Sequence, residues 1–353
     1  MLPADFPIED LEEVVGILKK ADFLLPGSNP PEAGIYHPAV YFEGRDKGVR
    51  TIILPDRNVA SRIAQLARGK KTLIDVQLQR CASLVAFAHL MDIDFEPGIA
   101  FHELAHRSGN AEAEEELGWF RAADNAPPQD MLNVALRRVD GVSRTYSPLP
   151  VQLQDMAHPL LRWNRNYITA LKILELDSST ESQLDKVLRL LEWMDERLVL
   201  AGPAVMLACI YLGTCTPSRK NVFKDRNAND RQAAIAGVKN AAWDITHLSD
   251  FVAKVNQVAN RSDQHYLFAS FDNHLMLTTR LLLQIGKVGS NASVIASGLT
   301  RWWSPQDAER IALAIMEHLQ RIGSDSHVPR SSDDPDYITN LIALGEQRLI
   351  ESR

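Results

Sequence analysis

Apolar residues recur every three to four positions along most of the chain, the spacing that places them on one face of an α-helix. This pattern predicts a mostly helical protein. The expected helices cover residues 9–20, 57–68, 73–91, 97–107, 110–123, 158–175, 181–199, 203–213, 229–257, 274–286, 305–321 and 336–351.

Two short apolar runs interrupt the helical pattern and predict strands, namely VRTIILP at 49–55 and HYLFASF at 265–271. Each resembles a central strand of a parallel sheet. Asp56 and Asp272 stand where these strands give way to helices. A single aspartate there is explained by its preference for the helix N-cap. Two of them on neighbouring parallel strands are expected at one edge of the sheet, where α/β proteins place their sites.

The helix expected at 229–257 carries a third acid within its apolar face. One row along that face is Gly237, Ala241, Asp244, Leu248, Phe251 and Val255. A carboxylate that faces the core is costly unless it is paired or binds a metal. Asp244 is therefore a candidate metal ligand. The alternatives are a salt bridge to a buried arginine or lysine, or a slightly rotated helix that lets Asp244 reach water.

The stretch HELAH at 102–106 matches the H-E-x-x-H pattern of zinc peptidases. His102 and His106 share a helix face, as two zinc ligands must. However, Gly109 ends the helix almost at once, and the third ligand at that spacing is Glu112, the first of an acidic run. One hypothesis is thus a zinc metallopeptidase with Zn²⁺ at the two histidines. A second hypothesis takes only Glu103 from the motif.

The second hypothesis follows from the order strand-Asp, helix-Glu, helix-Asp, strand-Asp. This order resembles the PIN-like nuclease family, on the stretches IILPDRNVAS, EPGIAFHELAHRSGN, NAAWDITHL and LFASFDNHL within residues 49–125 and 219–286. The resemblance implies a helix-rich α/β fold, with a short parallel sheet flanked by helices in three α/β/α layers. It also implies that Mg²⁺ or Mn²⁺ binds to the catalytic carboxylates, which are Asp56, Glu103, Asp244 and Asp272. The implied activity is metal-assisted hydrolysis of phosphodiester bonds, usually in RNA.

The same resemblance divides the chain into parts. It implies a helical segment at 1–48, a PIN-like nuclease domain at 49–125 and 219–290, a helical insertion at 126–218 and a helical region at 291–353. The inserted and C-terminal helices are candidate surfaces for a homodimer.

Other residues near the four acids are candidates for supporting roles. Outer-shell partners of the metal are Asn58, Asn240 and Asn273. Candidate phosphate contacts are Lys70, Lys71, Arg219, Lys220 and Lys224, with Arg68 and Arg226 in the same basic clusters. Solvated loop charge is the alternative interpretation of these clusters.

Composition narrows the class of protein. The chain has 353 residues, of which 45% are hydrophobic and 24% charged, as in soluble globular proteins. Its net charge of −7 is compatible with a nucleic-acid enzyme, because metal-binding carboxylates are themselves acidic. The three cysteines lack the spacing of a disulfide framework, and the N-terminus lacks the blocks of a signal peptide, so we expect a cytoplasmic protein.

Two further alternatives concern membranes and catalysis. Residues 198–218 carry no charge, but Gly202-Pro203 interrupts them and leaves the length of a buried core helix, so no membrane span is expected. A non-catalytic helical interaction protein or an RNA-binding protein remains the alternative to both enzyme hypotheses.

Overall fold

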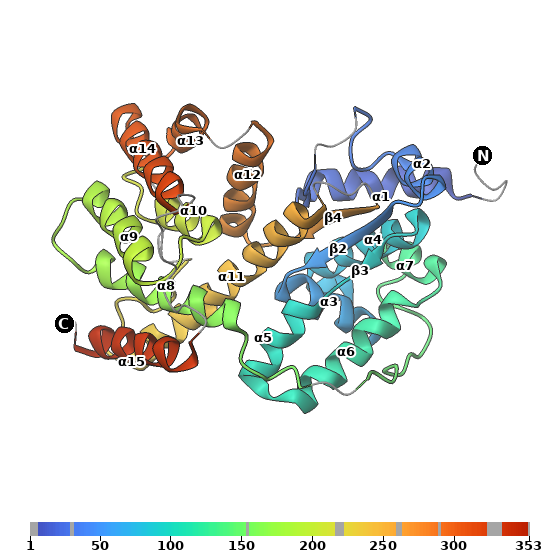
Figure 1. The fold of residues 1–353 in the computed structure, drawn as a ribbon. Helices are drawn as coiled ribbons and strands as arrows, with labels where there is room; N and C mark the ends of the chain where they lie inside the picture. Colours follow the sequence, from blue (N-terminus) through green and yellow to red (C-terminus); the bar gives the residue numbers. More distant parts are fainter. Residues whose placement is uncertain are drawn as a thin grey trace. The chain divides into compact units, whose positions relative to one another are not determined.

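The computed structural model describes residues 6–28, 32–152, 155–215, 222–258, 263–288, 291–322 and 334–351 (Figure 1). The chain forms two compact units. Unit 1 consists of Met1–His158 and Phe251–Asp272, and unit 2 consists of Pro159–Asp250 and Asn273–Arg353.

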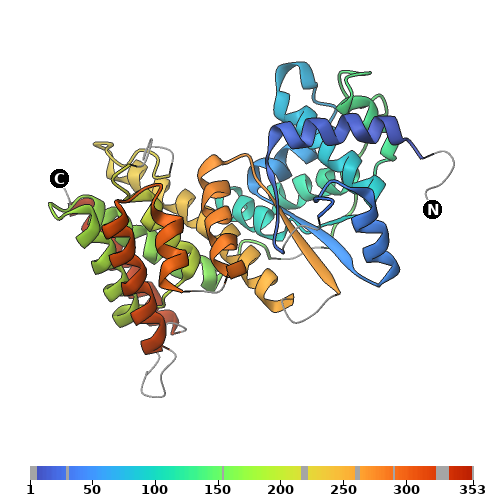
Figure 2. The same ribbon diagram turned by 90° about the horizontal axis from the view of Figure 1, so that it is seen from above.

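Unit 1 is built around a four-stranded sheet in the order β1-β4-β2-β3. The strands are β1 (Leu24–Pro26), β2 (Arg50–Pro55), β3 (Asp94–Phe95) and β4 (Gln264–Ala269). β2 lies parallel to β4, with Pro55 opposite Ala269, and parallel to β3, with Ile53 opposite Phe95. β2 and β4 run side by side in Figure 2. β1 is antiparallel to β4, so the sheet is mixed.

Helices flank this sheet. They are α1 (Ile8–Ala21), α2 (Pro38–Asp46), α3 (Arg57–Ala67), the 3-10 helix η1 (Thr72–Ile74), α4 (Val76–Met91), α5 (Gly98–Ser108), α6 (Asn110–Asp124), α7 (Pro128–Ala135) and the last turns of α11 (Arg231–Val258). α4 is the central helix of the core. Its residues from Cys81 to Ala88 are all buried, because they are small or apolar on every side of the helix. α1, α3 and α7 pack against it.

The described residues of unit 2 form helices joined by loops, with no strand among them. Its elements are α8 (Leu161–Asp177), α9 (Gln183–Arg197), α10 (Gly202–Tyr211), the first turns of α11, α12 (Asn273–Val288), α13 (Ala292–Leu299), α14 (Pro305–Ile322) and α15 (Pro335–Glu351). Every residue of α10 from Pro203 to Tyr211 is buried. The uncharged stretch at 198–218 thus supplies a core helix, and none of the described helices meets the length and hydropathy needed to cross a bilayer.

Each helix expected from the sequence has a counterpart, with ends shifted by a few residues, and the two expected strands are β2 and β4. The expectation of a purely parallel sheet was wrong, because β1 adds an antiparallel edge. β1 and β3, with three and two residues, are too short for an apolar period to reveal them. The short helices α2, α7 and α13 were missed for the same reason.

The two units divide the chain differently from the expected domains. Residues 126–158 belong to unit 1, where α7 packs on α4 and α1. The first part of α11 belongs to unit 2, since Val238, Ala241 and Ile245 join the core formed by α8, α10 and α14. The division therefore falls within α11, at a point that helical periodicity does not mark.

Two glycines of unit 2 provide a test of this packing. A Cβ on Gly237, in α11, would lie 2.0 Å from the carbonyl oxygen of Lys224, whereas one on Gly286, in α12, would meet no atom within 4 Å. Helical Gly→Ala substitutions normally stabilise by about 0.5–1 kcal/mol. We expect Gly286→Ala to raise the urea midpoint of unfolding and Gly237→Ala to lower it. Equal stabilisation by both would contradict the contact between α11 and Lys224.

Candidate functional site

Asp56 is a buried carboxylate at the carboxyl end of β2. Its backbone is still extended, and the next residue begins α3, so Asp56 is the N-cap of that helix. Its Oδ1 accepts a hydrogen bond of 2.8 Å from the backbone N–H of Val59, and the residue is only 4% exposed. The strand and the cap together fix the direction of this carboxylate.

Ser270 links Asp56 to the end of the neighbouring strand β4. Its hydroxyl is buried and donates a hydrogen bond to Oδ2 of Asp56. The same hydroxyl accepts a 3.0 Å bond from the backbone N–H of Asp272. The backbone N–H of Asp56 in turn donates to the carbonyl of Ala269 at 2.9 Å. The structure thus brings Asp56 and the backbone of Asp272 to one edge of the sheet, as parallel pairing requires.

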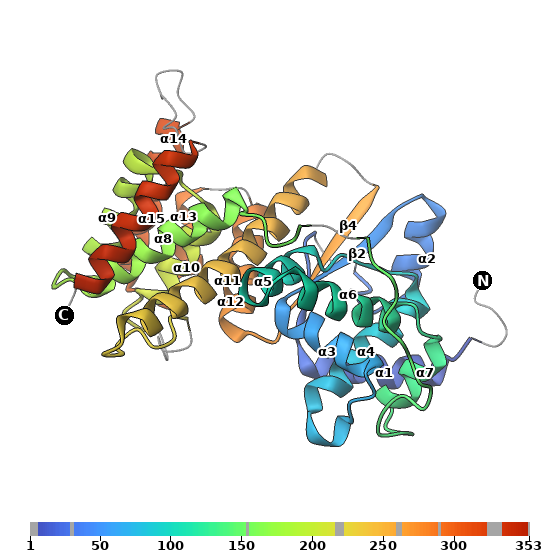
Figure 3. The ribbon, with the colours of Figure 1, turned by 90° about the horizontal axis from the view of Figure 1, so that it is seen from below.

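A largely buried ion pair holds the first turn of α3, which begins directly after Asp56. Nη1 of Arg57 donates to Oε1 of Glu116 on α6 at 2.7 Å, and both side chains are nearly buried. The guanidinium also lies over the ring of Phe101 on α5, 5.8 Å from its centroid. Figure 3 shows α5 and α6 beside each other, next to α3. The surroundings of Asp56 are therefore tied together by three helices.

Glu103 and Asp244 are both half-buried but belong to different units. Glu103 is half-buried on α5, in the same unit as Asp56 and Asp272. Asp244 belongs to unit 2, where it is half-buried on α11 between the fully buried Ala241 and Leu248. The apolar row expected along that helix is thus present.

No three His, Cys, Asp or Glu side chains among the described residues gather closely enough to hold a metal ion between them. The four-carboxylate site therefore stays a prediction.

Glu96 is an acid of this sheet edge that the sequence did not single out. It follows β3 directly, and its backbone N–H donates to the carbonyl of Ile53 in β2 at 2.9 Å. Its carboxylate forms an ion pair with Lys254 of α11, in the same unit. The sequence gives little sign of this position. Glu96-Pro97-Gly98 is typical of a chain reversal, and Glu96 is recognised as the end of a strand only if the two-residue strand before it is known.

The supporting residues expected from the sequence are mostly exposed. Asn58 and Asn273, which open α3 and α12, are exposed, and Asn240 is half-buried on α11. Their outer-shell role stays a prediction.

The basic candidates divide between the units. Lys70 and Lys71 are exposed in unit 1, and Nζ of Lys70 donates to Oε1 of Gln65 at 3.0 Å. Lys224 is exposed in unit 2. Arg219 and Lys220 lie outside the described residues.

The two arginines of the basic clusters have structural partners. Arg68 forms an exposed ion pair with Glu115. Arg226 pairs with Asp177 and donates to the hydroxyl of Tyr211 at 2.8 Å, within the core of unit 2. These contacts give Arg226 a structural role in unit 2, and its phosphate role stays a prediction.

The two histidines of HELAH hydrogen-bond to Met156 and His158, which lie between α7 and α8. Nδ1 of His102 donates to the carbonyl of Met156 at 2.7 Å, and Nε2 of His106 donates to the carbonyl of His158 at 3.1 Å. Carbonyls only accept, so these bonds fix the tautomers when the rings are neutral. The ring of His158 packs edge-on against His102, with centroids 5.1 Å apart. The zinc hypothesis stays a prediction, and these contacts give the two histidines a structural role.

The comparisons with known proteins do not identify this arrangement. The chain matches no family model, no curated protein and no solved structure. The candidate site is therefore defined by its own geometry, namely Asp56, Ser270 and Asp272 where β2 and β4 end.

The N-cap role of Asp56 predicts a difference between two substitutions. Asn is as good an N-cap as Asp and keeps the shape of the side chain, whereas Ala leaves the N–H of Val59 and the hydroxyl of Ser270 without their acceptor. We expect Asp56→Ala to lower the free energy of unfolding by about 1–2 kcal/mol and Asp56→Asn to change it by much less. Urea unfolding of both variants measures this. Equal losses would show that the cap does not hold α3.

His102 predicts how the stability of the protein depends on pH. Burial lowers the pKa of His102 below its ordinary value of 6.5, with His158 and His106 adding repulsion, while the bond to Met156 and the charge of Asp155 oppose this shift. The unfolded chain therefore binds more protons here, and stability falls as pH falls below 6.5 towards the lower folded value.

The corresponding measurement compares urea unfolding at about pH 7.5 and about pH 5.5. We expect wild-type protein to lose stability on acidification and His102→Gln to lose less, because glutamine does not titrate. If His102→Gln loses as much stability on acidification as wild type does, His102 is not the group responsible.

Proposed function

We propose that this chain is a metal-dependent nuclease that hydrolyses phosphodiester bonds in RNA, with Asp56 at its centre. The observation that carries the proposal is the buried, doubly hydrogen-bonded carboxylate of Asp56 where β2 ends, joined through Ser270 to Asp272 where β4 ends. Sites of α/β proteins lie at this edge of the sheet. The order of the acids along the chain also resembles that of PIN-like nucleases.

The donors present fit a hard divalent cation. Oδ1 of Asp56 accepts a hydrogen bond from the N–H of Val59 and Oδ2 accepts one from the hydroxyl of Ser270. A carboxylate has about four lone-pair sites, so a cation can bind beside such bonds. Mg²⁺ and Mn²⁺ prefer carboxylate oxygens, and Mg²⁺ is usually held by one or two carboxylates together with water and substrate phosphates. Two carboxylates at the sheet edge therefore suit such an ion without a closed protein cage. A bound ion would supply activation of the attacking water and stabilisation of the leaving oxygen.

Each residue has a distinct role in this proposal. Asp56 and Asp272 hold the ion, and Ser270 fixes the direction of Asp56. Glu103 and Asp244 are the further carboxylates that the resemblance implies. Lys70 and Lys71 are exposed cations of the same unit as Asp56 and contact the phosphates of the RNA strand.

Association of two copies through unit 2 belongs to the same proposal. Exposed apolar side chains stand on its last two helices, at Leu313 and Leu319 of α14 and at Leu344 and Ile350 of α15. Such side chains are favoured at protein interfaces when they form a contiguous patch.

The nuclease proposal predicts cleavage of labelled single-stranded RNA in the presence of Mn²⁺ or Mg²⁺, and its loss in EDTA. Asp56→Asn keeps the helix cap but removes the charge. We expect it to lower the rate by roughly 100-fold or more, a loss of the size seen when one preorganised electrostatic contact is removed from an active site. Asp272→Asn should act in the same direction.

Asp46→Asn is the matched control, because it makes the same change at an exposed position at the end of α2. It should leave cleavage unchanged. Absence of metal-dependent cleavage over varied RNA and DNA would contradict the proposal, and so would full activity of the Asp56→Asn variant.

A further inference from the structure

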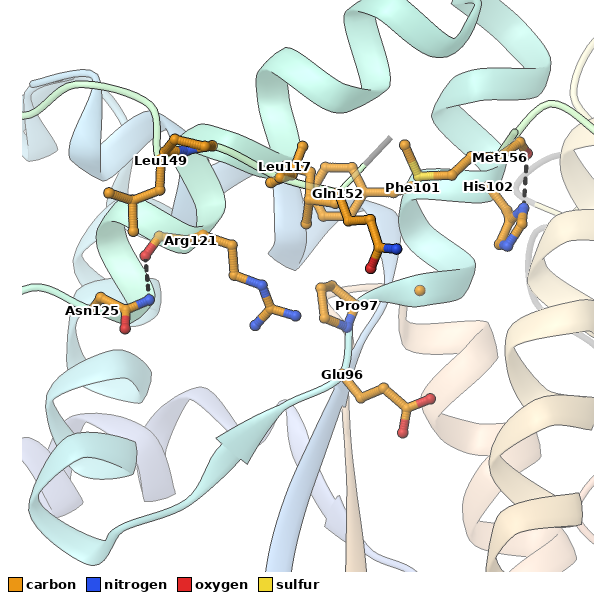
Figure 4. Close-up of a pocket in the computed structure, with 13 residues that line it drawn as sticks. Glu96, Pro97, Phe101, His102, Leu117, Arg121, Asn125, Leu149, Gln152 and Met156 are labelled. Atoms are coloured by element: carbon orange, nitrogen blue, oxygen red, sulfur yellow. Dashed lines mark hydrogen bonds between the residues drawn. The ribbon is translucent and has the colours of Figure 1, made fainter. Parts of the chain in front are cut away.

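A pocket of about 510 Å³ opens within unit 1 beside the carboxyl end of β3 (Figure 4). Its volume is typical of sites for small organic ligands. The walls come from the first turns of α5, from α6 and from the segment that crosses α6 after α7. The apolar part of the lining is formed by Phe101, Leu117, Leu149, Val151 and Met156.

The crossing segment is held in place at both ends of the pocket. At one end the N–H of Leu149 donates to the carbonyl of Gly118 on α6 at 3.0 Å. A Cβ on Gly118 would lie 2.8 Å from the carbonyl oxygen of Leu149, so only glycine lets the segment lie this close to α6. At the other end His102 donates to the carbonyl of Met156. The pocket therefore has a built wall.

The charged groups of the pocket are already compensated. Arg121 forms a 2.8 Å ion pair with Asp124, and Glu96 forms its own with Lys254. A free anion would also meet the carboxylate of Glu96, which lines the same space. The pocket thus favours a ligand whose buried part carries no charge.

The hydrogen-bonding groups that line the pocket are suited to recognising the edge of a flat ring. Figure 4 shows the guanidinium of Arg121 and the amide of Gln152 reaching into the pocket from α6 and from the crossing segment. Asn125 donates through Nδ2 to the carbonyl of Arg121, and its own side-chain oxygen is an acceptor at the pocket wall. Donors and acceptors at one side of an apolar recess are the features with which proteins recognise nucleobases.

We infer that this pocket binds a nucleobase of the RNA strand, next to the phosphate at Asp56. The inference rests on the proposed function, because it names a part of that substrate. Glu96 follows β3, Asp56 follows β2, and these strands are hydrogen-bonded neighbours. Neighbouring strands lie about 4.8 Å apart, so the pocket and the proposed centre share one sheet edge. A base adjacent to the reacting phosphate is the part of the strand that meets the pocket.

The test measures binding without catalysis. Full-length Asp56→Asn protein in EDTA is titrated with adenosine, guanosine, cytidine and uridine 5′-monophosphates, and with ribose 5-phosphate, by calorimetry. We expect at least one nucleotide to bind and ribose 5-phosphate to bind at least tenfold more weakly, since the base supplies the recognised edge.

Two added substitutions locate the binding. Gln152→Ala should weaken it roughly tenfold, the usual effect of one lost hydrogen bond in a site, and Val151→Trp should abolish it by filling the pocket. Gln129→Ala, an exposed glutamine on α7 outside the pocket, is the matched control and should bind as the parent does. Val151 and Gln152 lie outside regular helices. The circular dichroism of both variants should therefore match that of the parent, which checks that they fold.

The outcomes separate this inference from the nuclease proposal. Nucleotide binding that Val151→Trp abolishes supports the pocket even if RNA is not cleaved, whereas cleavage without nucleotide binding overturns the pocket alone. Equal binding of ribose 5-phosphate would show that phosphate is recognised and would also overturn it. Binding that Gln152→Ala and Val151→Trp both leave unchanged would place the ligand elsewhere and contradict the inference.

Discussion

The hydrogen bond from Ser270 to Asp56 is the interaction on which the candidate site depends. A carboxylate with 4% exposure is costly unless its oxygens are satisfied. The N-cap bond from Val59 satisfies one oxygen and Ser270 satisfies the other. Because Ser270 also accepts from the N–H of Asp272, the end of β4 is tied to the start of α3. The direction of Asp56 is thereby fixed before any ligand binds, which is the preorganisation that a metal site or a charged transition state requires.

The surroundings of Asp56 show how HELAH is used in this fold. Its histidines hold Met156 and His158 against α5, and Met156 is part of the lining of the pocket beside Glu96. Its leucine and alanine, Leu104 and Ala105, are buried in the core of unit 1. The motif therefore has a packing and positioning function whichever chemistry the sheet edge performs.

The sequence predicted the parts of this structure that repeat over many residues. Helical periodicity predicted α1, α3 and α11 because each buries an apolar face over several turns. The two long strands with an aspartate at the end led to Asp56 and Asp272, since a strand end and an N-cap are both local features.

Features that depend on tertiary contacts were beyond the sequence. Ser270 looked like one more residue of a strand, and its importance comes from a partner 214 positions earlier in the chain. Glu96 gained its position from a strand of two residues. The place of Asp244 was also open, because periodicity identifies the face of a helix but not the unit in which that face is buried.

The central claim is that a divalent cation binds at Asp56 and Asp272. It is tested most directly by anomalous diffraction from crystals of the protein soaked in Mn²⁺. The account predicts a manganese peak in contact with the carboxylates of both residues, absent from crystals of the Asp56→Asn variant. A peak at His102 and His106 instead, or none at the ends of β2 and β4, would contradict it.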